Sequence, residues 1–441
     1  MIRHYKDIIK LGTPIMVGNI GTIVLNFADT LMIGRHSTEE LAAASFINTL
    51  FIILILFATG FSIGITPMVG YLFGNGRHDK IGGVVRMALV ASSMLSLLLI
   101  LIAIGFYHVI PMLGQPEQLL GLMRPYLIVN IISLPFVCWT CSYKQFFDTI
   151  GRTKLSMTVL VVGNILNILG NYILIYGKCG LPELGLIGAG FSTLFARIVM
   201  AILFFLIFFH KKEFAVYKAH FFEAVRFKKE LYFKLLNKLG WPSAMQVATE
   251  SAAFSITAIF VGWMGVSSLA AHQIMLTISQ LFFMVYLGFC SASGVLVSHY
   301  FGSGDFESLR RCSWACFNIA LLESTAVGIP IYFYRDQIGW LFSTDANVVS
   351  MVSMTIIPLM VYQVGDALQC TFANTLRGLG EMRALMVSSF VCFFIVSLPL
   401  SWLFGVYFQW GLVGIWSSFS IPLTLAGIIY YWVYRRKLKG R

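Results

Sequence analysis

The feature that most constrains the fold of this chain is an internal repeat at a constant offset. Residues 239–304 repeat residues 11–76 without a gap. The clearest matches pair Leu-Gly-x-Pro at 11–14 with the same motif at 239–242, and Phe-Gly-x-Gly at 73–76 with 301–304. Because one register holds through two apolar segments and their loops, we predict that the halves share one fold. Among membrane bundles this duplicated plan is typical of transporters.

The composition indicates a membrane protein. The chain is 58% hydrophobic and 11% charged, whereas soluble folds carry about 25% charged residues. About 20 helical residues cross a bilayer, and twelve apolar stretches reach that length. We therefore predict an all-α integral membrane protein with twelve transmembrane helices. Their expected ranges are 11–34, 44–73, 84–107, 125–148, 155–177, 186–209, 239–264, 269–301, 313–333, 350–375, 384–406 and 411–433.

Basic residues predict the orientation, because Lys and Arg in short loops stay on the cytoplasmic side. With the amino terminus inside, 26 of the 31 fall in cytoplasmic ends and loops and four in outer loops, which leaves Arg197 deep inside a span. The net charge of +12 therefore indicates contact with anionic headgroups, and we expect no nucleic-acid partner. Since each half has six spans, both halves begin inside and form parallel repeats.

The repeat and the charges predict three parts. These are an amino-terminal six-helix lobe (1–209), a basic cytoplasmic linker with a short surface helix (210–238), and a carboxy-terminal six-helix lobe (239–441). The start has no cleavable signal pattern, so the first helix is expected to remain in the mature protein. Pro14 and Pro242 are expected in the first turns of their helices, where a missing amide donor costs nothing.

Cofactor chemistry finds no support in the sequence. The cysteines and histidines form no zinc pattern, and no nucleotide-binding loop is present, so we expect no cofactor and no enzyme activity. Transport would then be driven by an ion gradient. Lys144 and Asp148 stand four residues apart near the cytoplasmic end of a span and are predicted to form a structural ion pair.

Three acids inside predicted spans are the main functional candidates: Asp29, Glu250 and Asp366. Such a charge costs about 2.5 to 3.5 kcal/mol at the centre of a bilayer. At a rise of about 1.5 Å per residue, Glu250 and Asp366 lie about 15 and 16 Å from the cytoplasmic side. Gln246 and Tyr362 stand one turn away on the same faces. We predict that the two carboxylates form a site for a cation or a shared proton.

The amino-terminal half carries a different constellation. Asp29 lies about 26 Å from the inside, at about the level of Asn171 and Thr193, and Asn167 is one turn from Asn171. A carboxylate supported by two amides and a hydroxyl keeps hydrogen bonds in either protonation state, so we predict a proton-responsive substrate site. For Asn167 and Thr193 the alternative is a structural role, bonding helix to helix.

Several of these segments together resemble the multidrug and toxic compound extrusion (MATE) transporters. The resemblance rests on the Leu-Gly-x-Pro repeat, Asn-Phe-Ala-Asp-Thr-Leu-Met-Ile-Gly at 26–34, Ala-Ala-His-Gln-Ile at 270–274 and Asp-Ala-Leu-Gln at 366–369 with Leu-Arg-Gly at 376–378. Asn-Ile-Leu-Gly-Asn-Tyr-Ile-Leu-Ile-Tyr-Gly at 167–177, followed by Pro-Glu-Leu-Gly at 182–185, is similar to the bacterial NorM-like branch.

The resemblance implies a V-shaped pair of lobes and an antiporter that exports cationic, amphipathic drugs or toxic metabolites in exchange for sodium ions or protons. It also implies the bacterial cytoplasmic (inner) membrane. The basic residues place both termini in the cytoplasm, and we expect a monomer. The alternative is a flippase for a lipid-linked or other amphipathic metabolite from the same wider superfamily. That activity would need a basic cavity for phosphate, and Arg197 is the only deep basic residue.

The resemblance also assigns residues to the two sites. The cation site of the carboxy-terminal lobe, with its sodium ligands if sodium couples, falls on Glu250, Tyr362 and Asp366. The acidic site of the amino-terminal lobe falls on Asp29, Asn167 and Asn171. The lobes are not equivalent, since Thr257 occupies the place of Asp29, and Thr22 that of Glu250.

Overall fold

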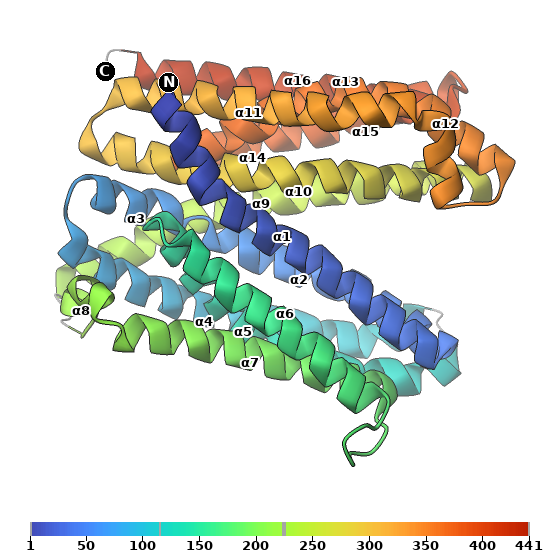
Figure 1. Ribbon diagram of the computed structural model, residues 1–441, viewed down its shortest axis with the longest axis horizontal. Coiled ribbons are helices and arrows are strands. Elements are labelled where there is room, and N and C mark those ends of the chain that lie inside the picture. Colours follow the sequence, from blue (N-terminus) through green and yellow to red (C-terminus); the bar gives the residue numbers. More distant parts are fainter. Residues whose placement is uncertain (1, 114–115, 223–225, 440–441) are drawn as a thin grey trace. The chain divides into compact units, whose positions relative to one another are not determined.

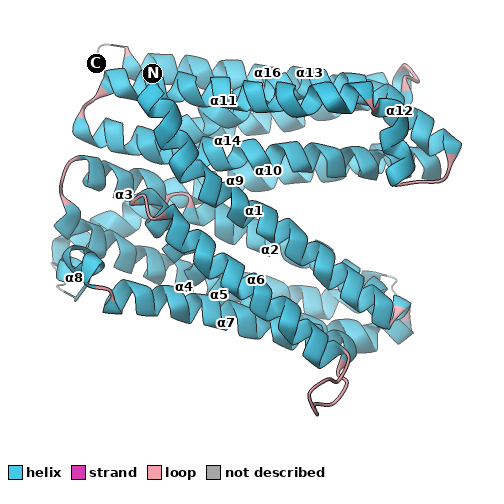
Figure 2. Ribbon diagram, viewed as in Figure 1, coloured by secondary structure: helices cyan, strands magenta, loops and turns pink. Residues whose placement is uncertain are grey.

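The computed structural model describes residues 2–113, 116–222 and 226–439, which form helices joined by short loops, with no strand among them (Figure 2). Within these described ranges twelve helical segments are long and apolar enough to cross a membrane, which confirms the predicted number of spans. The first six consist of α1 (Ile2–His36), α2 (Thr38–Ser62) with α3 (Ile65–Gly74), α4 (Ile81–Val109), α5 (Glu117–Thr149), α6 (Thr153–Ile175) and α7 (Gly185–His210).

The second six spans follow the same order. They consist of α9 (Arg226–Gly262), α10 (Val266–Ser303), α11 (Phe306–Phe333), α13 (Ala346–Gly378), the composite eleventh span and α16 (Gly411–Leu438). In the eleventh span a wider π-helical stretch at Phe390–Ser397 joins α14 (Met382–Ser389) to α15 (Leu398–Trp402), and a second one at Leu403–Tyr407 follows α15. Short helical turns lie at His78–Lys80, Ile110–Leu113, Lys212–Phe214 and Gly339–Leu341, and α12 spans Arg335–Ile338.

The predicted linker at 210–238 is largely helical. It contains the short helix α8 (Ala215–Phe222), as expected, but α9 already begins at Arg226 inside it. Arg86 in α4 donates a hydrogen bond from Nη1 to the Phe221 carbonyl oxygen (3.1 Å). The short helix is therefore fastened to the amino-terminal half.

The chain forms two compact units whose boundaries cut through the first helix of each half. A carboxy-terminal unit comprises residues 1–16 and 245–441, and an amino-terminal unit comprises residues 17–244. The start of α1 thus belongs with the second half, and the start of α9 with the first. Within the carboxy-terminal unit both chain ends lie at the same end of the helices (Figure 1), as an even number of spans requires.

Glycines at matching positions of the repeat explain why the starts of α1 and α9 each pack with the opposite half of the chain. In the carboxy-terminal unit α1 crosses α10 so closely that a Cβ added at Gly288 would lie 2.7 Å from the Met16 backbone nitrogen. In the amino-terminal unit α9 crosses α2, and a Cβ added at Gly60 would lie 2.7 Å from Ala244 Cα. Gly60 and Gly288 are repeat mates, and small residues let membrane helices approach this closely. The duplicated sequence therefore builds the same crossing twice.

The positions expected for Pro14 and Pro242 were wrong. The helices begin at Ile2 and Arg226, so both prolines lie inside a helix and not in its first turn. An internal proline removes one backbone hydrogen bond and favours a bend. The earlier starts were not predicted because residues 2–10 and 226–238 carry many charged side chains, so neither segment has transmembrane character.

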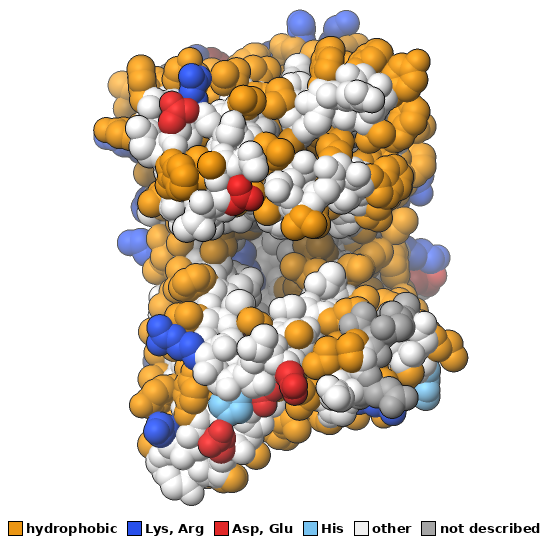
Figure 3. All heavy atoms as spheres, turned by 90° about the vertical axis from the view of Figure 1, so that its right-hand side faces the viewer, with side chains coloured by type: hydrophobic (Ala, Val, Ile, Leu, Met, Phe, Trp, Pro, Cys, Tyr) orange, Lys and Arg blue, Asp and Glu red, His pale blue; other side chains and the backbone are white. Residues whose placement is uncertain are grey.

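The surface carries the apolar side chains that a bilayer requires. Figure 3 looks along the helices at the end that lies to the right in Figure 1, where hydrophobic side chains are interspersed with polar ones. Large apolar side chains on the outer faces of the spans include Leu97, Leu101 and Leu322, which are 62%, 66% and 71% exposed. Exposure of this kind along spanning helices is what contact with lipid tails demands.

Candidate functional site

Glu250 lies at the centre of a hydrogen-bond network in the carboxy-terminal unit. Its Oε1 accepts hydrogen bonds from Gln246 Nε2 one turn earlier in α9 (2.8 Å) and from Gln369 Nε2 in α13 (2.9 Å). Ser389, the last residue of α14, adds a third donor at 3.3 Å. Three helices therefore converge on one carboxylate, and their donors stabilise its ionised form.

Around this carboxylate a second layer of polar contacts holds the donors in place. Arg377 Nη2 donates to Gln246 Oε1 (2.7 Å), which orients the Gln246 amide so that its nitrogen points at Glu250. Ser389 Oγ also contacts the Tyr430 hydroxyl in α16 (2.7 Å). The Arg377 guanidinium thus acts on Glu250 through the Gln246 amide. All three donors bind Glu250 Oε1, and none of them binds Oε2.

Asp366 lies in α13, three residues before Gln369, on the same side of the helix. The Tyr286 hydroxyl of α10 donates a hydrogen bond to Asp366 Oδ2. Since Gln369 reaches Glu250, the two acids lie within about one turn of each other in depth, but they share no direct hydrogen bond in the described part of the chain. Asp366 and Glu250 therefore flank one polar region, each held by its own donors.

Tyr362 is buried one turn before Asp366. Its ring packs edge-on against Trp416 (5.7 Å between centroids) and Phe419 (6.4 Å), both in α16. This aromatic wall keeps the ring in one place, on the side of α13 that faces α16. The structure thus places the three residues of the predicted cation site in one unit, with Tyr362 and Asp366 one turn apart in α13 and Glu250 in α9.

In the amino-terminal unit all four predicted residues form one chain of hydrogen bonds. Asn171 Nδ2 donates to Asp29 Oδ1 (2.6 Å) and to Asn167 Oδ1 (3.1 Å). Asn167 Nδ2 in turn donates to Thr193 Oγ1 (3.0 Å). The chain joins α1, α6 and α7, and Asn171 Oδ1 is buried without a hydrogen-bond donor among the described residues. An acceptor without a donor, beside a carboxylate, suits a ligand that carries N–H groups or positive charge.

Arg197 is the other charged group deep in this unit. Its Nη1 donates to Ser133 Oγ (2.5 Å) and to Asn130 Oδ1 (3.4 Å), and the guanidinium lies 5.4 Å from the Phe51 ring centroid. Near the predicted cytoplasmic end, Lys144 Nζ and Asp148 Oδ2 are 2.9 Å apart, so the predicted ion pair is present.

Sequence reasoning missed several residues of these networks. Gln369 had a signal, since it stands three residues after Asp366, but Tyr286 and Ser389 lie on other helices whose rotation no sequence pattern sets. Glu323, which lies within α11, was also not among the acids predicted as functional candidates. Among the described residues no group of three or more His, Cys, Asp or Glu side chains could hold a metal ion.

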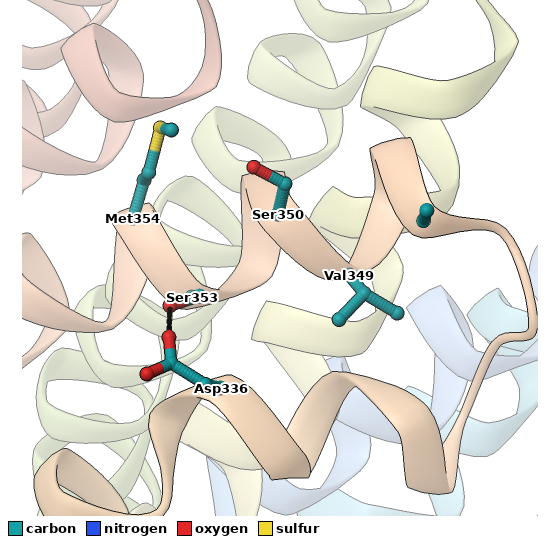
Figure 4. Close-up of a pocket in the computed structure, with 6 residues that line it drawn as sticks. Asp336, Val349, Ser350, Ser353 and Met354 are labelled. Carbon is teal, nitrogen blue, oxygen red and sulfur yellow. Dashed lines mark hydrogen bonds between the residues drawn. The ribbon is translucent and has the colours of Figure 1, made fainter.

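A separate surface pocket lies at the start of α13, where Asp336 and Ser353 are hydrogen-bonded (2.5 Å) beside Val349, Ser350 and Met354 (Figure 4). Asp336 belongs to α12, at the opposite end of α13 from the Arg377 end. At about 1.5 Å per residue the pocket is roughly 20 Å from Asp366, so it is not part of the acidic site.

Comparisons with known proteins agree with this architecture. The sequence profile of the MatE family matches residues 14–173 and 242–403, one segment in each repeat. The probable multidrug resistance protein NorM of Mannheimia succiniciproducens is 28% identical over 441 residues, covering 98% of this chain and 93% of the relative. The multidrug resistance protein NorM of Vibrio cholerae is 27% identical, covering 98% of this chain and 96% of the relative.

Solved structures show the same fold. One, described as the outward-facing conformation of a multidrug resistance MATE family transporter, superposes with a TM-score of 0.89 at 20% identity over 99% of this chain and 96% of the other. A MATE transporter from Vibrio cholerae superposes with a TM-score of 0.88 at 17% identity, over 100% of this chain and 98% of the other. With a family profile that matches both repeats, the chain belongs to the MatE family, whose members are membrane transporters and not enzymes.

Proposed function

We propose that this protein is a secondary active antiporter that exports cationic, amphipathic drugs or toxic metabolites in exchange for sodium ions or protons. The observation that carries the proposal is the pair of acids inside spanning helices, Glu250 and Asp366, each of which accepts hydrogen bonds from side chains of neighbouring helices. Charged groups are rarely retained at such depth without a transport role. Relatives named as multidrug resistance proteins support the substrate class.

In the carboxy-terminal unit Glu250, Asp366 and Tyr362 are the proposed coupling site. Gln246, Gln369 and Ser389 hydrogen-bond one oxygen of Glu250. When the coupling ion leaves, these donors still satisfy the charge, so the empty site remains accessible without a large desolvation penalty. A cation that enters neutralises the repulsion between the two carboxylates, which makes binding favourable.

In the amino-terminal unit Asp29 is the proposed site for the cationic substrate or its competing proton. Asn171 donates to Asp29, and its own Oδ1 accepts no hydrogen bond from any residue that the structure describes, so the pair offers negative charge and a hydrogen-bond acceptor side by side. Protonation of Asp29 removes the charge while its hydrogen bond to Asn171 can persist. Substrate release is therefore tied to proton uptake at this carboxyl group.

The remaining assignments follow from the distribution of charges and from the relatives. We place the protein in the bacterial cytoplasmic (inner) membrane as a monomer, with both termini in the cytoplasm, because basic residues gather on the loops next to them. The transport lobes are residues 1–209 and 239–441, joined by the basic segment at 210–238. Alternating access then moves one lobe relative to the other.

A flippase for a phosphorylated lipid is the second candidate, and Arg197 is the observation that bears on it. No carboxylate lies within salt-bridge distance of Arg197 in the described part of the chain, so its charge is available. Phosphate recognition, however, usually needs a cluster of basic groups. Lys144, nearer the predicted cytoplasmic end of this unit, is already paired with Asp148.

Reconstituted proteoliposomes test the proposal. An inward-directed sodium or proton gradient should drive the exchange of a fluorescent organic cation by the purified protein, and collapsing that gradient with a specific ionophore should stop it. Gradients are imposed one at a time with the membrane potential clamped. Transport that is indifferent to both gradients, or that requires a lipid-linked substrate, would reject the antiporter.

A further inference from the structure

Glu323 is an acid within a spanning helix that the proposed coupling site leaves unused. It lies in α11, and both of its carboxylate oxygens are buried without a hydrogen-bond partner among the described residues. An ionised carboxylate in this setting costs several kcal/mol. Retaining it without a donor therefore points to a ligand.

The packing of α11 shows what Glu323 faces. Glu323 is seven residues, or about two turns, from Cys316, so the two side chains lie on the same face of the helix. Cys316 Sγ lies 3.7 Å from Cys290 Sγ in α10 and 4.0 Å from Thr371 Oγ1 in α13. Glu323 thus faces the seam between α10 and α13, inside the carboxy-terminal unit.

Two contacts between α11 and α13 show which turn of α13 lies at the depth of Glu323. The rings of Trp314 and Phe372 are 6.0 Å apart, and a Cβ added at Gly328 would lie 2.8 Å from Met360 Sδ. Between these two contacts the helices run antiparallel, so Glu323 lies opposite the single turn of α13 that runs from residue 363 to 366. That turn ends at Asp366.

Gln363 supplies an independent observation at this turn. It is 1% exposed, yet its amide nitrogen and oxygen both lack hydrogen-bond partners among the described residues. It stands three residues after Met360, which contacts α11, and three before Asp366, which contacts α10, so its side chain lies at the same seam. Ser324, which is 5% exposed, adds a buried hydroxyl that also lacks a partner. A buried amide left unsatisfied costs about 1 to 3 kcal/mol.

We propose that Glu323, Gln363 and Ser324 form a second binding site for a monovalent cation. One carboxylate, one amide oxygen and one hydroxyl give three oxygen ligands, and oxygen is the ligand atom that hard cations prefer. The single negative charge balances one positive charge. Binding would satisfy the three groups together, and the Gln363 nitrogen would be free to donate to the Glu323 carboxylate.

This site shares a turn of α13 with Asp366 but uses none of the proposed coupling ligands. The inference deepens the proposed function, on which it rests for the direction of ion flow. A cation held at Glu323 would lie about one turn in depth from Asp366 and could move between the two positions. The carboxy-terminal unit would then bind two cations instead of one.

Equilibrium binding of radioactive sodium to the purified full-length protein at pH 8 tests the site. Wild type should bind two sodium ions per chain, and Glu323→Gln should remove one or weaken it at least tenfold. Gln363→Leu, which keeps the volume but removes the amide, should weaken the same site severalfold. Glu307→Gln makes the same chemical change as Glu323→Gln at an exposed position of α11 and should change nothing.

The double variant Glu250→Gln/Asp366→Asn separates this proposal from the proposed function. One sodium site should survive in it and should disappear when Glu323→Gln is added. If the double variant transported at the wild-type rate, the proposed coupling site would be rejected. The sodium-binding stoichiometry would still show whether the second site exists. Sodium binding that Glu323→Gln leaves unchanged in both backgrounds, or no sodium binding by wild type, would overturn the second site.

Discussion

The paired glycine crossings lead to a prediction whose size can be worked out from the structure. In Gly288→Ala the new Cβ would lie 2.7 Å from Met16 Cβ and 2.8 Å from Met16 Cα. Carbon atoms pack at about 3.5 to 4.0 Å, so the helices must separate by about 1 Å. Overpacking of this kind costs about 1 to 3 kcal/mol, while replacing a helical glycine returns up to about 1 kcal/mol.

We therefore expect a net loss of about 1 to 2 kcal/mol, or a fall of several degrees in Tm for a unit of this size. The assay is thermal unfolding of the detergent-solubilised protein. Gly60→Ala should lower Tm by about the same amount as Gly288→Ala, because the new Cβ would lie 2.7 Å from Ala244 Cα at the repeat-related crossing. Gly105→Ala in α4 is the control, since nothing lies within 4 Å of that Cβ. Equal Tm values for Gly288→Ala and Gly105→Ala would refute the close crossing.

Three further substitutions test separate parts of the structure. Asp29→Asn should weaken the binding of a fluorescent cation and abolish its pH dependence, because the amide cannot ionise; unchanged binding at every pH would contradict the assignment. Lys144→Met should destabilise the fold by about 3 to 5 kcal/mol, because it leaves the buried Asp148 carboxylate without its cation. Adding Asp148→Leu should restore much of the lost stability, as measured by thermal unfolding. Asp305→Ala should cost about 0.5 to 2 kcal/mol at pH 7 through loss of the α11 N-cap. The Ser308 backbone N–H donates to Asp305 and lowers the pKa of that carboxyl group. The stabilisation by the ionised cap is therefore complete above the ordinary pKa of Asp and is lost as pH falls through the lowered pKa of Asp305. If the Tm difference between wild type and Asp305→Ala did not shrink in acid, the capping role would be contradicted.

Contacts within a helix and at matching depth could be predicted from the sequence. Gln246 was expected beside Glu250 from their spacing, and the structure has that hydrogen bond at 2.8 Å. Asn171 was expected at the level of Asp29, and the two side chains are 2.6 Å apart. A helical rise and a periodicity are sufficient for such estimates, because they need only chain position.

Contacts that depend on how a helix is rotated or where it begins could not be predicted. Ser389 reaches Glu250 from the start of a π-helical stretch, and Tyr286 reaches Asp366 from α10. Neither residue has a spacing relation to its partner. The exchange of the first helices between units also escaped prediction, since it depends on backbone contact at Gly60 and Gly288. The glycines are visible in the repeat, but what they touch is not.

The central claim is that Glu250 and Asp366 couple ion movement to drug export, and single neutral substitutions test it most directly. Glu250→Gln and Asp366→Asn are reconstituted in proteoliposomes at equal protein content, beside wild type and the surface control Glu307→Gln. The initial rate of gradient-driven transport of a fluorescent cation is measured under sodium and proton gradients in turn. We predict at least a tenfold loss for each acid variant under the gradient that drives wild type, and none for the control. Wild-type rates in both acid variants under that gradient would contradict the account.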